Sequence, residues 1–274
     1  MIEASVVILT LNSSKTLNRC LQSINSFNDI IAIDGGSLDN TLNILRKYNC
    51  RIYKQNKIYK YTDKKIKNFS KVRFDALKLA KNNLVLFLDS DEFVSKKFCQ
   101  KLNIISKLKY LRRKISYYLI RRDVIFENCK ITNTAFWPNW HPRLVYKDNI
   151  NRYVKHVHER PIVVSNEQLL VKKCIDEAIR FDFPNSVNKI NLKHEYYYKI
   201  EKTFMVNSIN YRSLYFIFYR LLVLTKLFLV SINNIFFKKK KKFSKLETLM
   251  ILIYFKFTLK LFLSLFKLKK IKYK

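Results

Sequence analysis

The chain has 274 residues and a hydrophobic content of 49%, so it is long enough to bury a full core and too apolar to be disordered throughout. Its 54 Lys and Arg against 20 Asp and Glu give a net charge of +34, which favours an anionic partner: nucleic acid, a phospholipid surface or a phosphorylated substrate. Five dispersed cysteines without a C-x-x-C pair, and first residues without a basic and hydrophobic leader, predict reduced thiols in a cytoplasmic protein.

Strands alternating with helices fill the first part of the chain. Residues 5–11 form a continuous apolar run rich in β-branched side chains, as in a strand buried on both faces. Apolar residues at helical spacing predict helices from residue 15 and over 41–48, separated by strands over 30–33 and 51–54. This alternation is typical of βα units built on a parallel sheet.

Asp34 ends the second predicted strand and is followed by Gly35 and Gly36, the two glycines of the whole chain. Glycine at this point indicates a backbone with positive φ or the close approach of a ligand. Open α/β sheets bind ligands beyond the carboxyl ends of their strands, so Asp34 is placed to accept hydrogen bonds from a base or ribose. Ser37 or Asp39 is expected to cap the following helix.

A helix predicted over 70–81 turns one apolar face toward the core and leaves Arg73 off that face. The guanidinium of Arg73 has the fork geometry that suits a diphosphate, although an arginine on a helix surface is more often only solvated.

Leu84 to Leu88 are five apolar residues that stop at Asp89, with Asp91 two positions further on. Side chains alternate along a strand, so these two carboxylates converge on one point only if the chain turns at the end of the strand. Two hard oxygen ligands suggest Mg²⁺ or Mn²⁺, which is typically held by one or two carboxylates together with phosphate oxygens. The implied ligand is a nucleotide diphosphate, and the simpler alternative is an acidic turn.

Three of these runs, residues 6–12, 34–39 and 86–92, together resemble family 2 glycosyltransferases in order and spacing. Residues 137–144 and 157–160 are similar to the branch of that family that includes WaaE-like lipopolysaccharide core glucosyltransferases.

The resemblance implies a GT-A-type fold, an α/β architecture in which a Rossmann-like, mostly parallel sheet is flanked by helices. It also implies an inverting transfer from a nucleotide-diphosphate sugar, for which we expect a UDP-sugar, with Mg²⁺ or Mn²⁺ as cofactor. By position, Asp34 and Asp39 border the nucleoside and Arg73 contacts the donor phosphates. Asp89 and Asp91 hold the metal and the diphosphate.

Both tryptophans, Trp137 and Trp140, lie beside prolines in a short stretch after a helix predicted over 96–109 and a strand predicted over 115–122. Their rings suit stacking on sugar faces, which predicts a platform for the acceptor; a plug in the core is the alternative. The resemblance places Arg143 on the same acceptor side.

Glu159 is the predicted general base, because an inverting transfer needs a carboxylate that takes the proton from the attacking acceptor hydroxyl. His158 is expected to orient this carboxylate or the acceptor. The alternatives for Glu159 are an ion pair to Arg143 or Arg160, and zinc ligation with nearby histidines. The histidines available for zinc are His141, His156 and His158.

The last third of the chain is basic and apolar. Residues 166–202 read as helical, and residues 214–237 form an apolar helix whose polar residues, Arg220 among them, share one sector. Five lysines over 238–242 precede a second apolar helix, 246–268, with a lysine edge. Such helices lie in a membrane interface, where each lysine near an anionic leaflet contributes about 1 kcal/mol. We expect peripheral binding to the inner face of the cytoplasmic membrane; packing on the catalytic domain and a hairpin through the bilayer are the alternatives.

The expected organisation is a GT-A catalytic domain over 1–165, with a nucleotide-sugar half over 1–95 and an acceptor half over 96–165. A helical linker and acceptor-side segment over 166–212 and basic amphipathic helices over 213–274 follow.

The predicted function is metal-dependent glycosyl transfer to a lipopolysaccharide core or other lipid-linked acceptor. Two alternatives remain: a non-catalytic, membrane-associated scaffold of the same fold, and a basic nucleic-acid-binding protein. The lysines are densest where the chain is most apolar, which favours an anionic membrane surface over nucleic acid as the partner.

Overall fold

In a computed structural model of the chain, the residues described are 1–61, 63, 65–126, 129–131, 139–156, 159–164, 170–182, 187–206, 218, 220–225, 229 and 251–263. The chain divides into two compact units. The first comprises Met1–Ile125 and Pro138–Asp182, and the second comprises Phe126–Trp137 and Phe183–Lys274.

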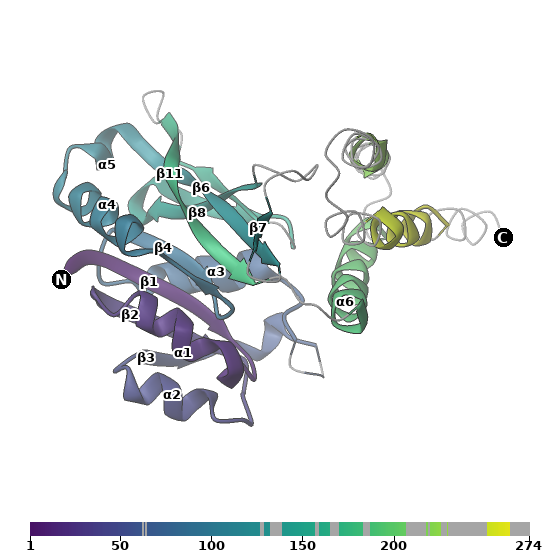
Figure 1. The fold of residues 1–274 in the computed structure, drawn as a ribbon, viewed down its shortest axis with the longest axis horizontal. Helices are drawn as coiled ribbons and strands as arrows, with labels where there is room; N and C mark the ends of the chain where they lie inside the picture. The colour runs from purple at the N-terminus through teal and green to yellow at the C-terminus, as the bar shows by residue number, and fades with distance from the viewer. Residues whose placement is uncertain are drawn as a thin grey trace. The chain divides into compact units, whose positions relative to one another are not determined.

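One mixed sheet organises the first unit (Figure 1). Among the described residues its strands follow the order β3-β2-β1-β4-β8-β6-β11-β5. The strands are β1 (Ile2–Thr10), β2 (Phe27–Asp34), β3 (Arg51–Lys54), β4 (Leu84–Asp89), β5 (Glu92–Phe93), β6 (Ile115–Phe126), β8 (Asn139–Tyr146) and β11 (Leu170–Asp182). From β3 to β4 the pairings are parallel, whereas β8 runs antiparallel to both β4 and β6. β11 is parallel to β6 and antiparallel to β5.

Helices and a small hairpin complete the first unit. The α-helices are α1 (Ser14–Ser23), α2 (Thr41–Lys47), α3 (Phe69–Lys78), α4 (Lys96–Lys107) and α5 (Leu111–Lys114). Two short 3-10 helices are η1 (Lys57–Tyr59) and η2 (Lys147–Asn149), and β9 (Ile150–Val154) pairs antiparallel with β10 (Arg160–Val163).

The sheet is covered on both faces, which explains the continuous apolar run of β1. Val6 and Ile8 belong to the core layer that contains α1, α2 and α4, and Val7 belongs to the opposite layer with α3 and β9. A strand buried on both faces needs apolar residues at every position rather than at alternate ones.

The register brings acidic strand ends to one edge of the sheet. Thr10 at the end of β1 pairs with Asp34 at the end of β2, and Leu9 pairs with Asp89 at the end of β4. Asp34 and Asp89 therefore flank the end of β1, two strand spacings apart, or roughly 10 Å.

Most of the predicted elements of the first unit are confirmed. The strands expected over 30–33, 51–54 and 84–88 are β2, β3 and β4, and the helix expected over 96–109 is α4. The parallel core of the sheet, with its helices on both faces, is the GT-A-type architecture expected from the motifs.

The expectation that residues 166–202 are helical is wrong in its first half, because Leu170–Asp182 is strand β11. Ile179 and Phe181 are buried while Arg180 between them is exposed, a period of two that belongs to a strand. Pairing with β6 and β5, both distant in sequence, decides the conformation of this segment.

Apart from Phe126 at the end of β6 and β7 (Cys129–Ile131), the described residues of the second unit are helical. Its described helices are α6 (Val187–Val206) and the helical residues 220–225 and 251–263. Ile190 of α6 packs with Ile253 and Phe257 in a small core. No helix within the described ranges combines the length and the apolar character needed to cross a bilayer.

Asp29 anchors the opposite end of the sheet. Its carboxylate accepts hydrogen bonds from Ser5 Oγ at 2.5 Å, from Arg51 Nε at 2.9 Å and Nη2 at 3.0 Å, and from the Lys81 backbone N–H at 3.0 Å. The carboxylate is 2% exposed, so these contacts replace all of its hydration.

We predict that Asp29→Asn lowers the free energy of unfolding by about 2–3 kcal/mol, because the partly buried Arg51 guanidinium and the Lys81 amide lose a charged acceptor. Urea denaturation measures the change. The control is Asp63→Asn: its ion pair with Lys65 is half exposed, so we expect a change within about 0.5 kcal/mol. Equal effects of the two substitutions would contradict the anchoring role of Asp29.

Candidate active site

Asp34 closes the loop that follows β2. Its Oδ1 accepts hydrogen bonds from Thr10 Oγ1 at 2.9 Å and Ser37 Oγ at 2.6 Å. Its Oδ2 accepts the backbone N–H groups of Gly36 and Ser37, both at 2.8 Å. The side chain is buried, and its immediate role is to fold the loop back onto the end of β1.

Both glycines are needed by the geometry of this loop. Gly36 has a φ of 100°, which disfavours any residue with a Cβ. A Cβ on Gly35 would lie 3.1 Å from Leu11 Cδ1 and 3.3 Å from the Thr10 carbonyl, to which the Gly35 N–H donates. The Gly35 carbonyl in turn accepts a 2.6 Å hydrogen bond from Lys60 Nζ.

Asp39 joins the amino ends of two helices. It accepts the Ser14 N–H of α1 at 3.1 Å, and the Thr41 N–H and Oγ1 of α2 at 3.0 and 2.5 Å. These hydrogen bonds hold the pKa of Asp39 below its ordinary value. The N-cap position of α2 is Asn40 and not Ser37 or Asp39, so Asp39 accepts the first N–H of the helix from one residue before the cap; its carboxylate is exposed.

Asp89 forms ion pairs with two arginines. Arg143 of β8 forms a two-pronged contact, with Nη1 at 3.2 Å from Oδ1 and Nη2 at 2.7 Å from Oδ2. Arg73 of α3 adds a third contact, from Nη2 to Oδ1 at 3.1 Å. The Asp89 side chain nevertheless stays 37% exposed, so it remains open to a ligand.

Glu92 lies beneath Asp89 and is fully buried. Its Oε2 accepts the backbone N–H of Asp89 at 2.9 Å, which closes the turn from β4 to β5. Its Oε1 contacts Arg143 Nη2 at 3.1 Å and Arg122 Nη1 at 3.5 Å. Glu92 therefore ties the turn to both β8 and β6.

Arg73 links this turn to Glu159, the residue before β10. Its Nε forms an ion pair with Glu159 Oε1, and its guanidinium lies 5.2 Å from the centroid of the Phe87 ring. Arg73 is 5% exposed, so the expectation that it lies off the buried face of α3 is wrong. It is buried because carboxylates from two other segments neutralise it.

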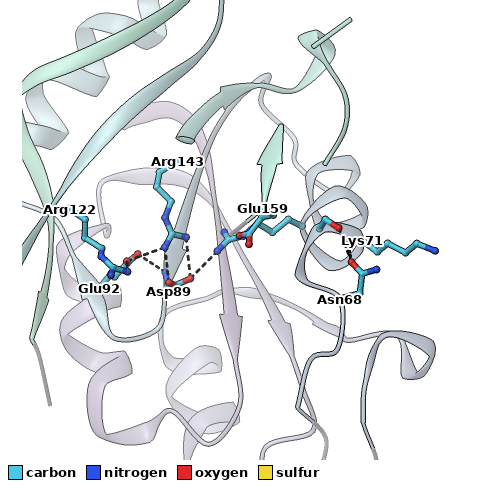
Figure 2. Close-up of polar contacts among 9 residues, drawn as sticks. Asn68, Lys71, Asp89, Glu92, Arg122, Arg143 and Glu159 are labelled. Carbon is cyan, nitrogen blue, oxygen red and sulfur yellow. Dashed lines mark hydrogen bonds and ion pairs between the residues drawn. The ribbon is translucent and has the colours of Figure 1, made fainter. Parts of the chain in front are cut away.

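The start of α3 is fixed from two sides. Asn68 caps the helix by accepting the Lys71 N–H at 3.1 Å (Figure 2). The His156 carbonyl accepts the Phe69 N–H at 3.0 Å. Arg73 is thereby presented from a helix end held against the segment that leads to Glu159.

Six side chains thus form one row of alternating charge, which we call the ion-pair chain. Its members in order are Glu159, Arg73, Asp89, Arg143, Glu92 and Arg122. Figure 2 shows the contacts around Asp89 and Arg143 at its centre. The three arginines and three carboxylates balance, so the row carries no net charge of its own.

Charge and burial act in opposite directions along this row. Burial raises the pKa of Asp89, but Arg143 and Arg73 outweigh it and hold that pKa well below its ordinary value. Burial also raises the pKa of Glu92, and there it exceeds the opposing effect of Arg143. Burial lowers the pKa of Arg143, yet its two carboxylate partners raise it above the ordinary value.

The donor set at this strand end fits a divalent cation bound together with phosphates. A carboxylate offers about four lone-pair sites, and Asp89 uses three of them for arginine contacts, which leaves one on Oδ2. Asp91 follows in the turn and is partly exposed. Within the described part of the chain no group of three or more His, Cys, Asp or Glu side chains forms a metal cage. A cation here would take Asp91 and Asp89 and complete its shell with phosphate oxygens and water.

Some of the other predicted site residues lie at the carboxyl edge of the sheet, and others lie outside the described residues. Trp140 of β8 is partly exposed, three residues before Arg143. Trp137 and His158 lie outside the described residues. Arg143, expected on the acceptor side, instead directs its guanidinium at Asp89 and Glu92. Glu159 pairs with Arg73, whereas the sequence had suggested Arg143 or Arg160.

Glu92 and Arg122 were missed by the sequence reasoning. Glu92 directly follows the Asp-x-Asp pair, and an acidic residue beginning a two-residue strand was the available signal. Arg122 carried no signal, because its place beside Glu92 depends on the pairing of β6 with its neighbours.

Comparison with known proteins identifies the family to which the motifs point. The sequence profile described as glycosyl transferase family 2 matches residues 5–159, more than half of the chain. No curated protein matches the chain.

The chain is also similar to two solved structures of bacterial proteins. TarS of S. aureus in complex with UDP-GlcNAc is 19% identical, with 67% of this chain and 59% of that chain covered and a TM-score of 0.45. Glucosyl-3-phosphoglycerate synthase of Mycobacterium tuberculosis, with Mn²⁺, UDP and glucosyl-3-phosphoglycerate, is 16% identical, with 45% and 44% covered and a TM-score of 0.32. The chain therefore spans less than two thirds of either structure.

Proposed function

Because the chain belongs to glycosyl transferase family 2, we propose that it transfers a sugar from a nucleotide-diphosphate donor to a glycan acceptor, with inversion at the anomeric carbon. The observation that carries this proposal is the ion-pair chain at the carboxyl edge of the sheet. It connects Asp89, at the end of a parallel strand, to Glu159, an acid from a separate segment. Donor and acceptor chemistry need such a pair of carboxylates on opposite sides of one reacting carbon.

The nucleotide is proposed to lie over the ends of β1, β2 and β4. The Asp34 loop and Asp39 border the nucleoside, for which a UDP-sugar is the expected donor. Asp34 supports this role by shaping the loop, since its own carboxylate is already occupied by Thr10, Gly36 and Ser37. Open α/β sheets bind nucleotides at this edge.

The diphosphate is proposed to lie against Asp89, Asp91 and Arg73. A bound Mg²⁺ or Mn²⁺ would supply the positive charge that stabilises the departing diphosphate. Arg73 supports the same role from the protein side. Its Nη1 is buried without a hydrogen-bond partner within the described structure, so one donor is left for a phosphate oxygen.

Glu159 is the proposed general base. It takes the proton of the acceptor hydroxyl as the hydroxyl oxygen bonds to the anomeric carbon and the bond from that carbon to the diphosphate oxygen breaks. The Glu159 side chain is 15% exposed, so it keeps access to an acceptor while Arg73 fixes its orientation. We assign His158 to orient this carboxylate or the acceptor.

The acceptor is proposed to be a glycan carried on a lipid, with a lipopolysaccharide core as one form. The support is the resemblance of residues 137–144 and 157–160 to the WaaE-like branch. Trp137 and Trp140 would provide stacking faces for its sugar rings.

The second unit supports a place at an anionic membrane surface, on the inner face of the cytoplasmic membrane. One polar cluster of this unit lies inside it: Arg220 is buried, with Nη1 2.7 Å from Glu201 Oε2 and Nε 3.2 Å from Thr258 Oγ1. Many of its outward side chains are large and apolar, beside exposed charged residues of α6. Among the described residues, those exposed by 40% or more are Leu192, Phe218, Leu221, Leu222, Leu229, Leu252, Phe255, Leu259, Phe262 and Leu263.

This unit exposes more large apolar side chains than its small apolar core buries. Exposed leucine and phenylalanine side chains on adjacent turns, with Lys256 exposed among them, suit the boundary between headgroups and acyl chains. Arg220, one of the polar residues that share a sector of the predicted 214–237 helix, is buried and its guanidinium is satisfied within the unit.

Glu159→Gln is predicted to lower turnover by about 10²- to 10⁴-fold, because the acceptor proton loses its base, while affinity for UDP changes less than about threefold. Sugar-transfer assays with UDP-sugars and calorimetric titration with UDP measure the two quantities. The matched control is Glu195→Gln, which alters an exposed pair with Lys260 and should leave turnover intact. Undiminished turnover in Glu159→Gln would remove the assignment, and a wild-type chain that binds UDP without turnover would favour a non-catalytic role.

The double substitution Leu252→Ser and Leu259→Ser is predicted to weaken binding to phosphatidylglycerol vesicles by about tenfold or more, since each buried leucine contributes about 1.5–3 kcal/mol. Co-sedimentation measures the bound fraction, with phosphatidylcholine vesicles testing the charge requirement. Ile104→Ser removes an equally exposed apolar side chain from α4 and should have no effect. The membrane assignment fails if wild-type protein stays in the supernatant or if the double variant binds as well as wild type.

A further inference from the structure

Among the described residues of the site, Arg143 makes the most extensive set of charged contacts, and its hydrogen bonds go to Asp89 and Glu92. It lies on β8, the antiparallel neighbour of β4, and is 7% exposed. Nη1 and Nη2 contact the two oxygens of Asp89 at 3.2 and 2.7 Å, and Nη2 also lies 3.1 Å from Glu92 Oε1. A planar fork that meets both oxygens of a carboxylate fixes the rotation of that carboxylate, which a single ammonium cannot do.

Glu92 holds the same unit from below. Its Oε1 faces the Arg143 guanidinium, and its Oε2 accepts the backbone N–H of Asp89 at 2.9 Å. The backbone and the side chain of Asp89 are therefore both fixed through one buried carboxylate. Asp91 lies two residues further along the turn that this carboxylate closes.

We infer that Arg143, held in place by Glu92, is a positioning residue of the donor site: it fixes the Asp89 carboxylate and the turn that carries Asp91 toward the donor diphosphate. The inference rests on the proposed function and gives Arg143 a donor-side role in place of the acceptor contact expected from sequence. Partners that orient the ligands of a metal commonly change metal affinity or activity by about 10- to 100-fold when they are altered.

Arg122 provides an internal comparison. It also contacts Glu92, at 3.5 Å, but the described structure gives it no contact with Asp89. If the charge near Glu92 were all that mattered, substitution of either arginine would have the same effect. If the two-pronged contact with Asp89 matters, Arg143 alone is sensitive to the loss of the fork.

The test compares Arg143→Lys and Arg122→Lys with wild type in the full chain. UDP with MnCl₂ is the probe for calorimetric titration, and backbone amide exchange of the peptide around Leu88–Phe93 reports on the turn. We expect Arg143→Lys to bind UDP and Mn²⁺ about 10- to 100-fold more weakly and to exchange the Asp89 amide faster. The affinity loss of Arg122→Lys for UDP and Mn²⁺ should be at least several-fold smaller than that of Arg143→Lys. Arg112→Lys, in an exposed pair with Asp148, is the surface control and should match wild type.

The outcomes separate the inference from the function on which it rests. Equal losses in Arg143→Lys and Arg122→Lys, or wild-type binding in Arg143→Lys, overturn the positioning role while the proposed function stands. Absence of UDP binding by wild type overturns the proposed function. In that case unchanged amide exchange in Arg143→Lys would show separately that Arg143 does not hold the turn. Thermal unfolding of each variant shows whether the fold is intact. Lysine is chosen at position 143 because it keeps the buried positive charge and so favours an intact fold.

Discussion

The ion pairs of Arg143 and Arg73 with Asp89 are the interactions on which the rest of the site depends. These contacts join β8 and α3 to the end of β4, and each arginine reaches a further carboxylate, Glu92 or Glu159. A buried charge is tolerated only with a partner, so loss of one member leaves its neighbours uncompensated at a cost of about 3–5 kcal/mol. The site is therefore held as a unit and not as separate ligands.

In the proposed function, this arrangement connects the donor and acceptor sides of the transfer reaction. Asp89 lies at the strand edge where a nucleotide diphosphate is expected, and Glu159 comes from the segment beside β10. Arg73 contacts both carboxylates. A phosphate that binds Arg73 therefore also changes the electrostatic surroundings of Glu159, the proposed base. The second unit has Arg220 and Glu201 inside and several leucines outside, which supports the proposed place at a lipid surface that would carry the acceptor.

The parts of this account that the sequence could provide are local. The apolar run before Asp89 and the glycines after Asp34 depend on neighbours in the chain, and both proved to mark strand ends at one edge. The partners of Arg143 could not be read in this way, because they follow from the pairing of β8 with β4, which joins residues more than 50 positions apart. The strand β11 was missed for the same reason, since β6 and β5 determine its conformation.

The most direct measurement of the central claim is calorimetric titration of the full chain with UDP, with and without MnCl₂, beside the Asp91→Asn variant. If the acidic strand end binds a cation together with a diphosphate, UDP binds wild type in the presence of Mn²⁺, and affinity falls by about tenfold or more with EDTA or in the variant. The account would be contradicted if neither EDTA nor Asp91→Asn changed the affinity for UDP, or if the wild-type chain did not bind UDP at all.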